Sequence, residues 1–343
     1  MFCGVINVLF AGAALLAPFR PGEVTVGGEV GHRTSVTLGK MLHHTDIEGT
    51  FTRHFRHRKA KPDEPGGFAG YGMFLDALVT AAAHGIGGAE TVRAKTRLLA
   101  ELGELQSPDG RITMFSGAPG FWDNHEGAYL IQALCRDHRW FGTAASLETA
   151  RRLGDALIAD GAFPTLGSET AYLLLYEETK DRRYRDWLEK SAAIGDGIDA
   201  YDRKVKVNGV QHVYTWLARA LAQLQYADAV EADLPTRAAL SAAAEEALRR
   251  ARGPYLSVTG SITGTPRWGE LWDATQAGLG KWGETCASAY LMRLAAKAIE
   301  RAPDAACWRP LRARDVQRLL LRAVGGRTQV PLLDAVQRAR AVV

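Results

Sequence analysis

The sequence predicts an all-α fold, and more particularly a closed toroid built from pairs of helices. Helical signals dominate the chain from Gly66 onward, and strand signals between the expected helices are few, chiefly at Leu256–Ile262. A motif in which a polar residue opens a helix and a tyrosine follows recurs every 43 residues, at Glu126, Glu169 and His212. A period of this length with two helices per unit is typical of a helical array.

The two helices of each unit differ in character. The first is apolar on most of its faces, whereas the second is amphipathic and more heavily charged, for example at Ala150–Asp160. An open solenoid would more often need polar capping repeats at its ends. The sequence therefore favours a closed toroid with apolar inner helices and amphipathic outer ones.

The individual elements follow from their start and stop signals. Glu23–Lys40 is rich in valine and threonine and is expected to form one or two short strands or an extended arm. Thr50–Pro65 is basic and then proline-bearing, which predicts a loop. Aspartate, glycine and proline fall at the junctions of the later helices. These helices are expected at Gly72–His84, Glu90–Gln106, Asn124–Trp140, Ser146–Asp160, Glu169–Thr179, Asp181–Ile194, Val210–Ala229, Leu234–Arg252 and Glu284–Arg301.

Composition limits the class of protein. The chain has 343 residues, 47% hydrophobic and 23% charged, which suits a globular protein with one large core or two domains. Its four cysteines have no paired spacing, so a disulfide framework is not expected. Residues 307–343 carry eight arginines and two aspartates, a net charge of +6. Because the whole chain has a formal charge of +4, the rest of it carries −2. We therefore expect no nucleic-acid partner.

The first 17 residues are apolar and carry no charged side chain. This run is too short to span a membrane comfortably and matches the core of a signal peptide, so no membrane span is expected. Ala13, Ala14 and Ala17 would allow cleavage, but no lysine or arginine precedes the run. Export to the periplasm or the extracellular space is one expectation. A cytoplasmic protein with a buried N-terminal segment, or a misplaced start codon, is the alternative.

Polar and aromatic residues at the helix starts predict a binding mouth. If the inner helices all begin at one end of the toroid, these residues converge there. They are Trp122, His125, Glu126, Glu169, His212, Trp268, Trp272, Trp282 and Glu284. Aromatic faces stack on sugar rings, imidazoles and carboxylates bond sugar hydroxyls, and two carboxyls can divide acid and base catalysis. A carbohydrate is the expected substrate.

Glu284 and Cys286 open the last helix, and a further carboxylate, Glu270, lies upstream in a Trp-Gly-Glu-Leu-Trp-Asp run. Free N–H groups at a helix start favour anions, and a thiolate with a carboxylate would supply half of a zinc site. The plainer interpretation is that Cys286 is a core residue, as a cysteine in a helix usually is.

Several of these motifs together resemble the β-L-arabinofuranosidases of glycoside hydrolase family 127 and their relatives. The resemblance covers roughly Val26–Arg301 in family order, and its most specific block is Gly-Glu-Thr-Cys-Ala at 283–287. The other matching blocks are WDNHE at 122–126, TKDRRY at 179–184, GVQH at 209–212, VTGSI at 258–262 and GE at 269–270. The resemblance implies an (α/α)6 barrel, a six-hairpin glycosidase-like toroid, whose usual C-terminal β-sandwich domains are not expected here.

The resemblance also implies roles for individual residues. In the family, the glutamate and cysteine of Glu-Thr-Cys bind zinc with two further cysteines, one of which is the nucleophile. Glu284 and Cys286 would then be zinc ligands, and Glu270 the general acid/base of a retaining mechanism. Ser168 stands where family members often carry a histidine. The residues that would bind the sugar are Trp122, Asp123, His125, Glu126, His212 and Trp272.

The chain departs from the family after its last helix. The family's other two cysteines form an adjacent or near-adjacent pair beyond the barrel, whereas only the isolated Cys307 follows here. Read from the second nucleotide of each codon, residues 307–343 permit a sequence like the family's at this point. We therefore expect a frameshift between about Glu300 and Cys307, and an enzyme impaired by the loss of its nucleophile. A true divergent basic tail is the alternative.

The predicted organisation has four parts. Residues 1–20 form a leader, 21–65 an extended arm and loop, 66–305 the barrel, and 306–343 an aberrant basic tail. Besides a hydrolase acting on plant-type glycans, two other functions stay open. The first is a non-catalytic barrel that binds sugar. The second is another α/α-toroid enzyme, a sugar epimerase or a polysaccharide lyase. An epimerase would need paired histidines, and a polysaccharide lyase a tyrosine or histidine base with a charge neutraliser for a uronate.

Overall fold

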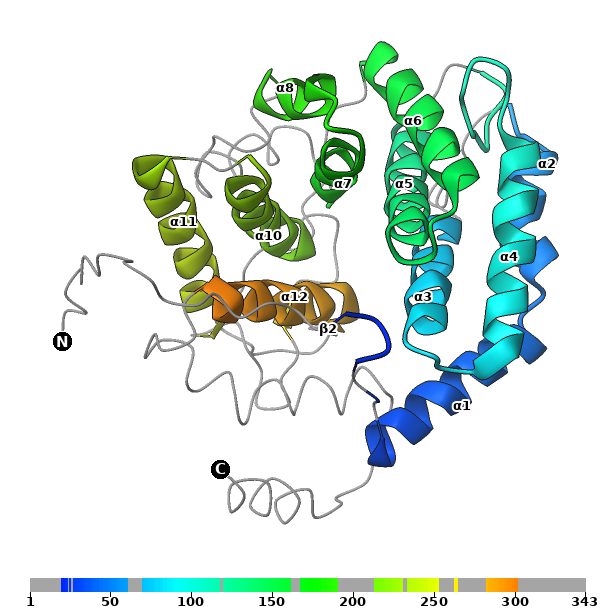
Figure 1. Ribbon diagram of the computed structural model, residues 1–343, viewed down its shortest axis with the longest axis horizontal. Coiled ribbons are helices and arrows are strands. Elements are labelled where there is room, and N and C mark those ends of the chain that lie inside the picture. Colours follow the sequence, from blue (N-terminus) through cyan, green and yellow to red (C-terminus); the bar gives the residue numbers. More distant parts are fainter. Residues whose placement is uncertain are drawn as a thin grey trace.

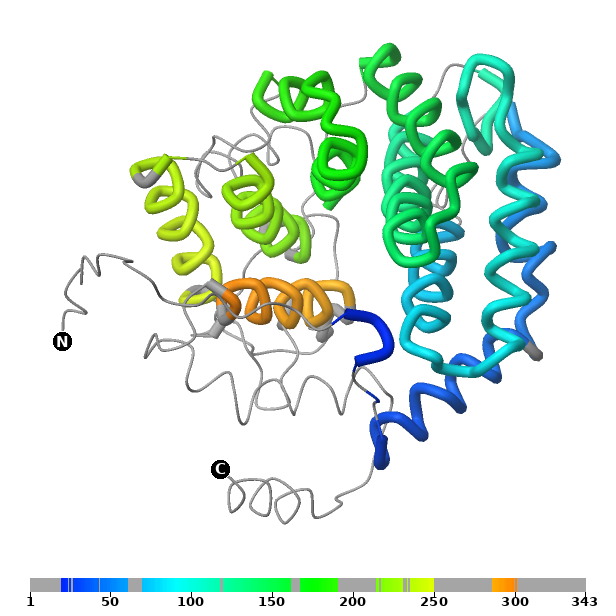
Figure 2. Tube along the Cα trace, viewed as in Figure 1, coloured from blue at the N-terminus to red at the C-terminus, as the bar shows by residue number. Residues whose placement is uncertain are grey.

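The computed structural model describes residues 20–23, 25, 27–60, 70–117, 120–161, 167–190, 213–230, 233–252, 262–264 and 282–301. Within these ranges the regular secondary structure is helical apart from two short strands, as expected for an all-α toroid. The helices form an arc (Figure 1), and the chain follows this arc in sequence order (Figure 2).

Inner and outer helices alternate along the chain. Each inner helix contacts the next inner helix, in the order α3 (Tyr71–Ala83), α5 (Phe121–Phe141), α7 (Glu169–Thr179), α10 (Val213–Ala229) and α12 (Thr285–Arg301). Each outer helix packs on the inner helix before it, and these are α4 (Gly88–Leu105), α6 (Ala144–Ala159), α8 (Arg182–Lys190) and α11 (Leu234–Arg252). This alternation confirms the predicted helical hairpins.

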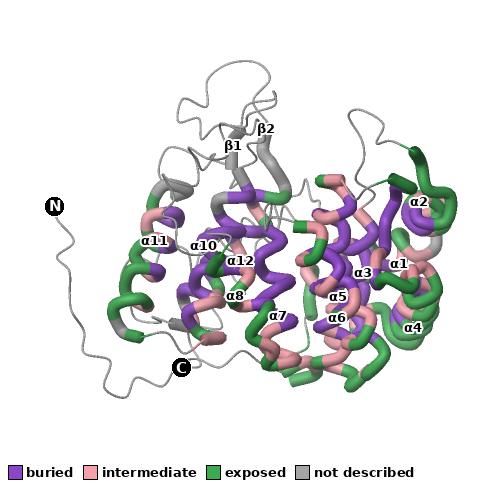
Figure 3. The backbone as a smooth tube through the Cα atoms, turned by 90° about the horizontal axis from the view of Figure 1, so that it is seen from above, coloured by how far each residue is buried: buried purple, intermediate pink, exposed green. Residues whose placement is uncertain are grey.

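Burial follows the same division. On the inner helix α5, every residue from Asp123 to Cys135 except Asn124 is buried. The outer helix α6 buries one stripe, at Ser146, Ala150, Leu153, Gly154, Ala156 and Leu157. Figure 3 shows the contrast between mostly buried inner helices and the exposed outer sides of α4 and α11. Burial on all sides, which includes polar residues such as Glu126 and Gln132, places α5 inside the ring.

The core consists of two hydrophobic clusters. The first, which includes Leu75, Leu130 and Tyr172, runs from the N-terminal helices through α7 and α8 to Ala222 on α10 and Leu240 on α11. The second, which includes Leu221 and Leu291, joins α10, α11 and α12. The two halves of the described chain therefore share core contacts where α7 and α10 pack together.

The N-terminal segment corrects one prediction. Glu23–Lys40 was expected to form strands, but α1 (Gly28–His44) is a helix. Glu29 and Arg33 form an ion pair of 2.5 Å one helical turn apart, and Leu38 is buried against the first cluster. The β-branched residues that suggested strands carry only a weak propensity, which such tertiary contacts override.

The expected loop at Thr50–Pro65 is also partly helical. A π-helical turn, η1 (Glu48–Thr52), runs into the short helix α2 (Arg53–Arg56). Phe51 stacks on Phe74 with ring centroids 4.8 Å apart, and Phe55 is 3% exposed. Two aromatic side chains four residues apart therefore anchor this segment to α3, which its basic composition did not indicate.

Strands β1 (Ile262–Gly264) and β2 (Trp282–Glu284) pair antiparallel, with Ile262 opposite Glu284. Helix α12 starts directly after β2, so Glu284 precedes the helix instead of lying in its first turn. The predicted leader up to residue 19 and the predicted basic tail lie outside the described residues. None of the helices that the structure describes is long and apolar enough to cross a membrane.

Candidate active site

A buried hydrogen bond joins two inner helices near their starts. The hydroxyls of Tyr129 on α5 and Tyr290 on α12 are 2.8 Å apart. The ring of Tyr290 also stacks on that of Tyr214 on α10, with centroids 5.7 Å apart. The contact fixes the spacing of α5 and α12 within the ring.

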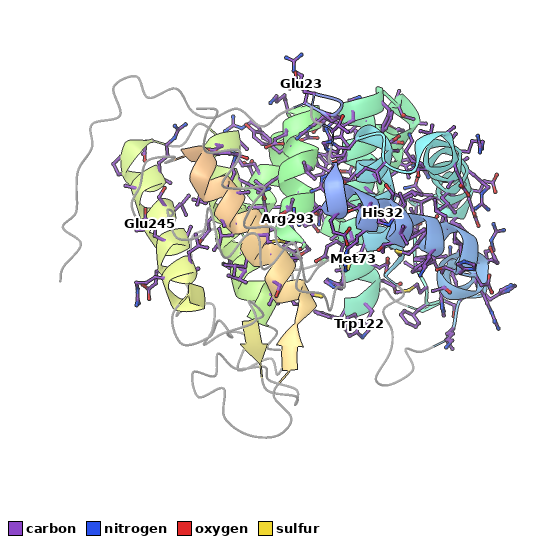
Figure 4. The ribbon with its side chains drawn as sticks, turned by 90° about the horizontal axis from the view of Figure 1, so that it is seen from below. Glu23, His32, Met73, Trp122, Glu245 and Arg293 are labelled. Atoms are coloured by element: carbon purple, nitrogen blue, oxygen red, sulfur yellow. The ribbon has the colours of Figure 1, made fainter. Side chains whose placement is uncertain are left out.

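Two of the predicted site residues lie one helical turn before these two hydrogen-bonded tyrosines. His125 precedes Tyr129 by four residues, and Cys286 precedes Tyr290 by four residues. Figure 4 shows Trp122, in the first turn of α5, at the same end of the molecule as the β1–β2 pair from which α12 starts. The structure therefore brings the starts of α5 and α12 to one end, which we call the mouth.

His125 lies among aromatic rings at the mouth. Its imidazole is 4% exposed and stacks on Phe121 with centroids 6.1 Å apart. Trp122 and Tyr129 meet it edge-on, at 5.9 Å and 5.1 Å. Phe121 is 39% exposed and Trp122 is half-buried, so both present aromatic surface to a ligand. Sequence reasoning missed Phe121, although it stands directly beside the Trp-Asp-Asn-His-Glu block.

Asp123 is predicted to bind sugar, but the structure gives it another role. The carboxylate is 1% exposed and accepts hydrogen bonds from the N–H groups of Met114 at 2.6 Å and Gly120 at 3.3 Å. Burial raises the pKa of Asp123, and these two bonds oppose the rise. Asp123 therefore holds the 111–117 loop against the start of α5.

Glu126 also corrects the prediction. Its side chain is 0% exposed, and its two oxygens accept hydrogen bonds from the N–H groups of Gly70 at 2.9 Å and Gly72 at 2.5 Å. The first N–H groups of a helix have no partner within the helix. Glu126 satisfies them for α3, and therefore ties two inner helices together instead of reaching the sugar.

Glu169 and Arg219 form a charged pair within the ring. They are 0% and 2% exposed, and the Arg219 Nη1 lies 3.8 Å from the Glu169 Oε1. Burial raises the pKa of Glu169, and the Arg219 charge opposes the rise. Glu169 was expected at the mouth as a helix-start residue, but the structure encloses it between α7 and α10.

Several predicted residues cannot be placed. Glu270, His212 and Trp272 lie outside the described residues, as does the side chain of Glu284. Cys286 is exposed at the start of α12. The proximity of the predicted acid/base to the predicted zinc ligands therefore stays a prediction.

The described residues do not make up a zinc site. No group of three or more His, Cys, Asp or Glu residues able to hold a metal occurs among them. Cys286 and Glu284 would supply two donors, whereas zinc takes four ligands, or three with a water. Cys135 is 0% exposed in the core, where burial raises the pKa of its thiol, so it cannot complete the set.

Comparison with known proteins bears on the fold. No protein-family profile matches the chain, and no curated protein matches it by sequence. A solved GH127 β-arabinofuranosidase superposes with a TM-score of 0.67 at 16% identity, over 90% of this chain and 54% of that one. A GH127 β-L-arabinofuranosidase from Geobacillus stearothermophilus T6 gives a TM-score of 0.62 at 17% identity, over 86% and 53%.

The chain thus spans about half the length of these two solved structures. At this level of identity the similarity concerns the fold. It confirms that the chain has the helical toroid of these enzymes, as the motifs at the helix starts implied.

Proposed function

We propose that this chain is the barrel of a retaining glycoside hydrolase that acts on β-L-arabinofuranosides of plant-type glycans. The observation that carries the proposal is the hydrogen bond between Tyr129 and Tyr290, which sets the starts of α5 and α12 at one mouth. The fold that the chain shares with two solved GH127 enzymes supports it. The Glu-Thr-Cys block at the start of α12 supports it further.

The mouth residues would divide the work as follows. Phe121 and Trp122 offer exposed aromatic surface on which a sugar ring stacks, and His125 beside them can bond a hydroxyl. In a retaining mechanism a thiolate would attack the anomeric carbon while Glu270 protonates the departing oxygen, and Glu270 would then deprotonate the water that displaces the thiolate. Zinc held by Glu284 and Cys286 stays part of the proposal, with its other ligands to come from outside the described residues.

Hydrolysis of p-nitrophenyl β-L-arabinofuranoside tests this function. Glu270→Gln should lower kcat by about a hundredfold or more, because the acid/base proton is lost. Glu245→Gln is the matched control, since Glu245 is exposed on the outer helix α11 (Figure 4), and its turnover should equal that of the wild type. Equal turnover in both variants would exclude Glu270 as the acid/base.

A non-catalytic sugar-binding barrel is the second candidate, and one observation favours it. The family's nucleophile is a cysteine, and Cys286 is the one thiol that the described residues place at the mouth, because Cys135 lies in the core. Calorimetric binding of L-arabinose by a wild-type protein that releases no nitrophenol would establish this alternative. Measurable turnover would exclude it.

A further inference from the structure

We propose that a pocket beside the mouth binds a uronic acid residue of the glycan. This inference rests on the proposed function in one respect, because the uronic acid is taken to belong to the plant-type glycan proposed as the substrate. The pocket has a volume of about 470 Å³, within the range of roughly 300–1,000 Å³ that is typical of small-molecule sites. Its walls come from Arg58, just after α2, and from the loop that joins α4 to α5.

The pocket lies next to the sugar-binding surface. Its wall includes Thr113 and Phe115, and Met114 between them donates its N–H to Asp123 in the first turn of α5 at 2.6 Å. Lys59 pairs with the same loop, donating its N–H to the Met114 carbonyl at 3.1 Å. The neighbouring Arg58 is thereby held at the pocket, at the end of α5 that carries Trp122.

Arg58 is the cation that the pocket leaves for a ligand. Its side chain is exposed and forms no hydrogen bond or ion pair with the residues that the structure describes, and its charge acts only over a longer distance on the buried Asp123, where it opposes the rise in pKa that burial causes. Arg111, the other guanidinium of the lining, is already engaged by Asp109 and by both oxygens of Asp160. An anion entering the pocket would therefore meet Arg58, with the planar fork that suits a carboxylate.

The remaining lining favours a sugar carboxylate over a phosphate. The Ser107 hydroxyl and Arg111 lower the pKa of Asp109 to about 2, so Asp109 is charged and would repel a dianion. The carboxylate of Asp109 can instead accept hydrogen bonds from the hydroxyl groups of a sugar. Thr113 and Ser116 donate their hydroxyls to backbone carbonyls at 3.2 Å and 3.3 Å, which leaves oxygen lone pairs for further hydroxyl donors.

Apolar surface completes the match. Pro108 and Phe115 also line the pocket, and Phe115 is 6% exposed. The C–H face of a pyranose packs on such surface, whereas a free inorganic anion gains nothing from it. One negative charge, several hydroxyls and one apolar face together describe a uronic acid.

Calorimetry on the full chain tests this proposal with two ligands that differ only at C6, methyl galacturonide and methyl galactoside. We expect the galacturonide to bind about tenfold more tightly, because the charged hydrogen bonds to Arg58 are absent for the galactoside. Arg58→Gln should abolish this preference. Arg53→Gln should retain it, because Arg53 is an equally exposed arginine of α2 that does not line the pocket.

Equal affinity for the two ligands, undetectable binding, or an equal loss in both variants would overturn the proposal. The result is independent of turnover. A preference that depends on Arg58 in a protein that leaves p-nitrophenyl β-L-arabinofuranoside intact would support the pocket while the hydrolase assignment fails. Turnover of p-nitrophenyl β-L-arabinofuranoside by a protein that binds the galacturonide and the galactoside equally would support the hydrolase assignment and overturn the pocket proposal.

Discussion

The hydroxyls of Tyr129 and Tyr290 meet at 2.8 Å inside the helical ring, although 161 positions separate the two residues in the chain. Tyr290 belongs to the hydrophobic cluster of α10, α11 and α12, while Tyr129 lies on α5, which packs with α3, α6 and α7. This contact therefore links the two halves of the described chain, and it does so directly beneath the mouth.

Replacing either tyrosine should destabilise the fold. Tyr129→Phe or Tyr290→Phe removes this buried hydrogen bond and keeps one of its two hydroxyls, which should cost about 1–3 kcal/mol in urea unfolding. The double variant removes both polar groups and should cost little more than either single variant. Tyr226→Phe is the control, because its hydroxyl bonds the exposed Glu189. Strictly additive losses would show that the two hydroxyls are not coupled.

Helices α3 and α5 approach so closely that the contact requires a glycine. A Cβ on Gly72 would lie 2.6 Å from the backbone nitrogen of Leu130. Gly72→Ala should therefore destabilise the protein by about 1–3 kcal/mol, because neither backbone can yield. At Gly103 on α4 a Cβ would meet nothing within 4 Å, so Gly103→Ala should stabilise by about 0.5–1 kcal/mol. Thermal unfolding compares the two, and a change of the same sign in both would contradict the packing argument.

The helix pattern was readable from the sequence because it is local. The predicted bounds Glu169–Thr179 and Leu234–Arg252 match α7 and α11. The failure at α1 has the opposite cause. Its sequence has the valines and threonines of a strand. The residues on which Leu38 packs belong to other parts of the chain, so the local sequence does not reveal that contact.

The candidate site divides in the same way. The position of Trp122 and His125 at a helix start was predictable because it depends on a local sequence pattern, whereas their contact with a sugar stays a prediction. The role of Glu126 was not predictable, because its partners Gly70 and Gly72 are more than 50 residues away. The bond from Tyr129 has no sequence signature either, since it depends on how distant helices close the ring.

The stability of the protein should depend on pH through Glu169. Burial raises the pKa of this carboxyl above its ordinary value of 4.5 in the folded protein. Its contribution is then fully present below pH 4.5 and is lost as the pH rises through the raised pKa. Glutamine has no proton to lose, so Glu169→Gln should gain stability relative to the wild type as the pH increases to about 8.

Urea unfolding at a series of pH values measures this difference. Glu245→Gln serves as the control, because the exposed Glu245 side chain should leave the pH profile parallel to that of the wild type. A Glu169→Gln profile that also runs parallel from acid to neutral pH would show that burial does not perturb the carboxyl.

The two ends of α5 offer a matched test of the mouth. Trp122 lies at its start beside His125, whereas Trp140 lies near its other end with its ring edge toward His84, 6.3 Å away. Both indoles are half-buried. Trp122→Ala should raise the KM for p-nitrophenyl β-L-arabinofuranoside about tenfold, because the sugar loses its stacking surface, while kcat changes little. Trp140→Ala should leave KM unchanged even if it lowers the melting temperature equally. Equal increases in KM would mean that the indole at the mouth stabilises the helix and does not hold the substrate.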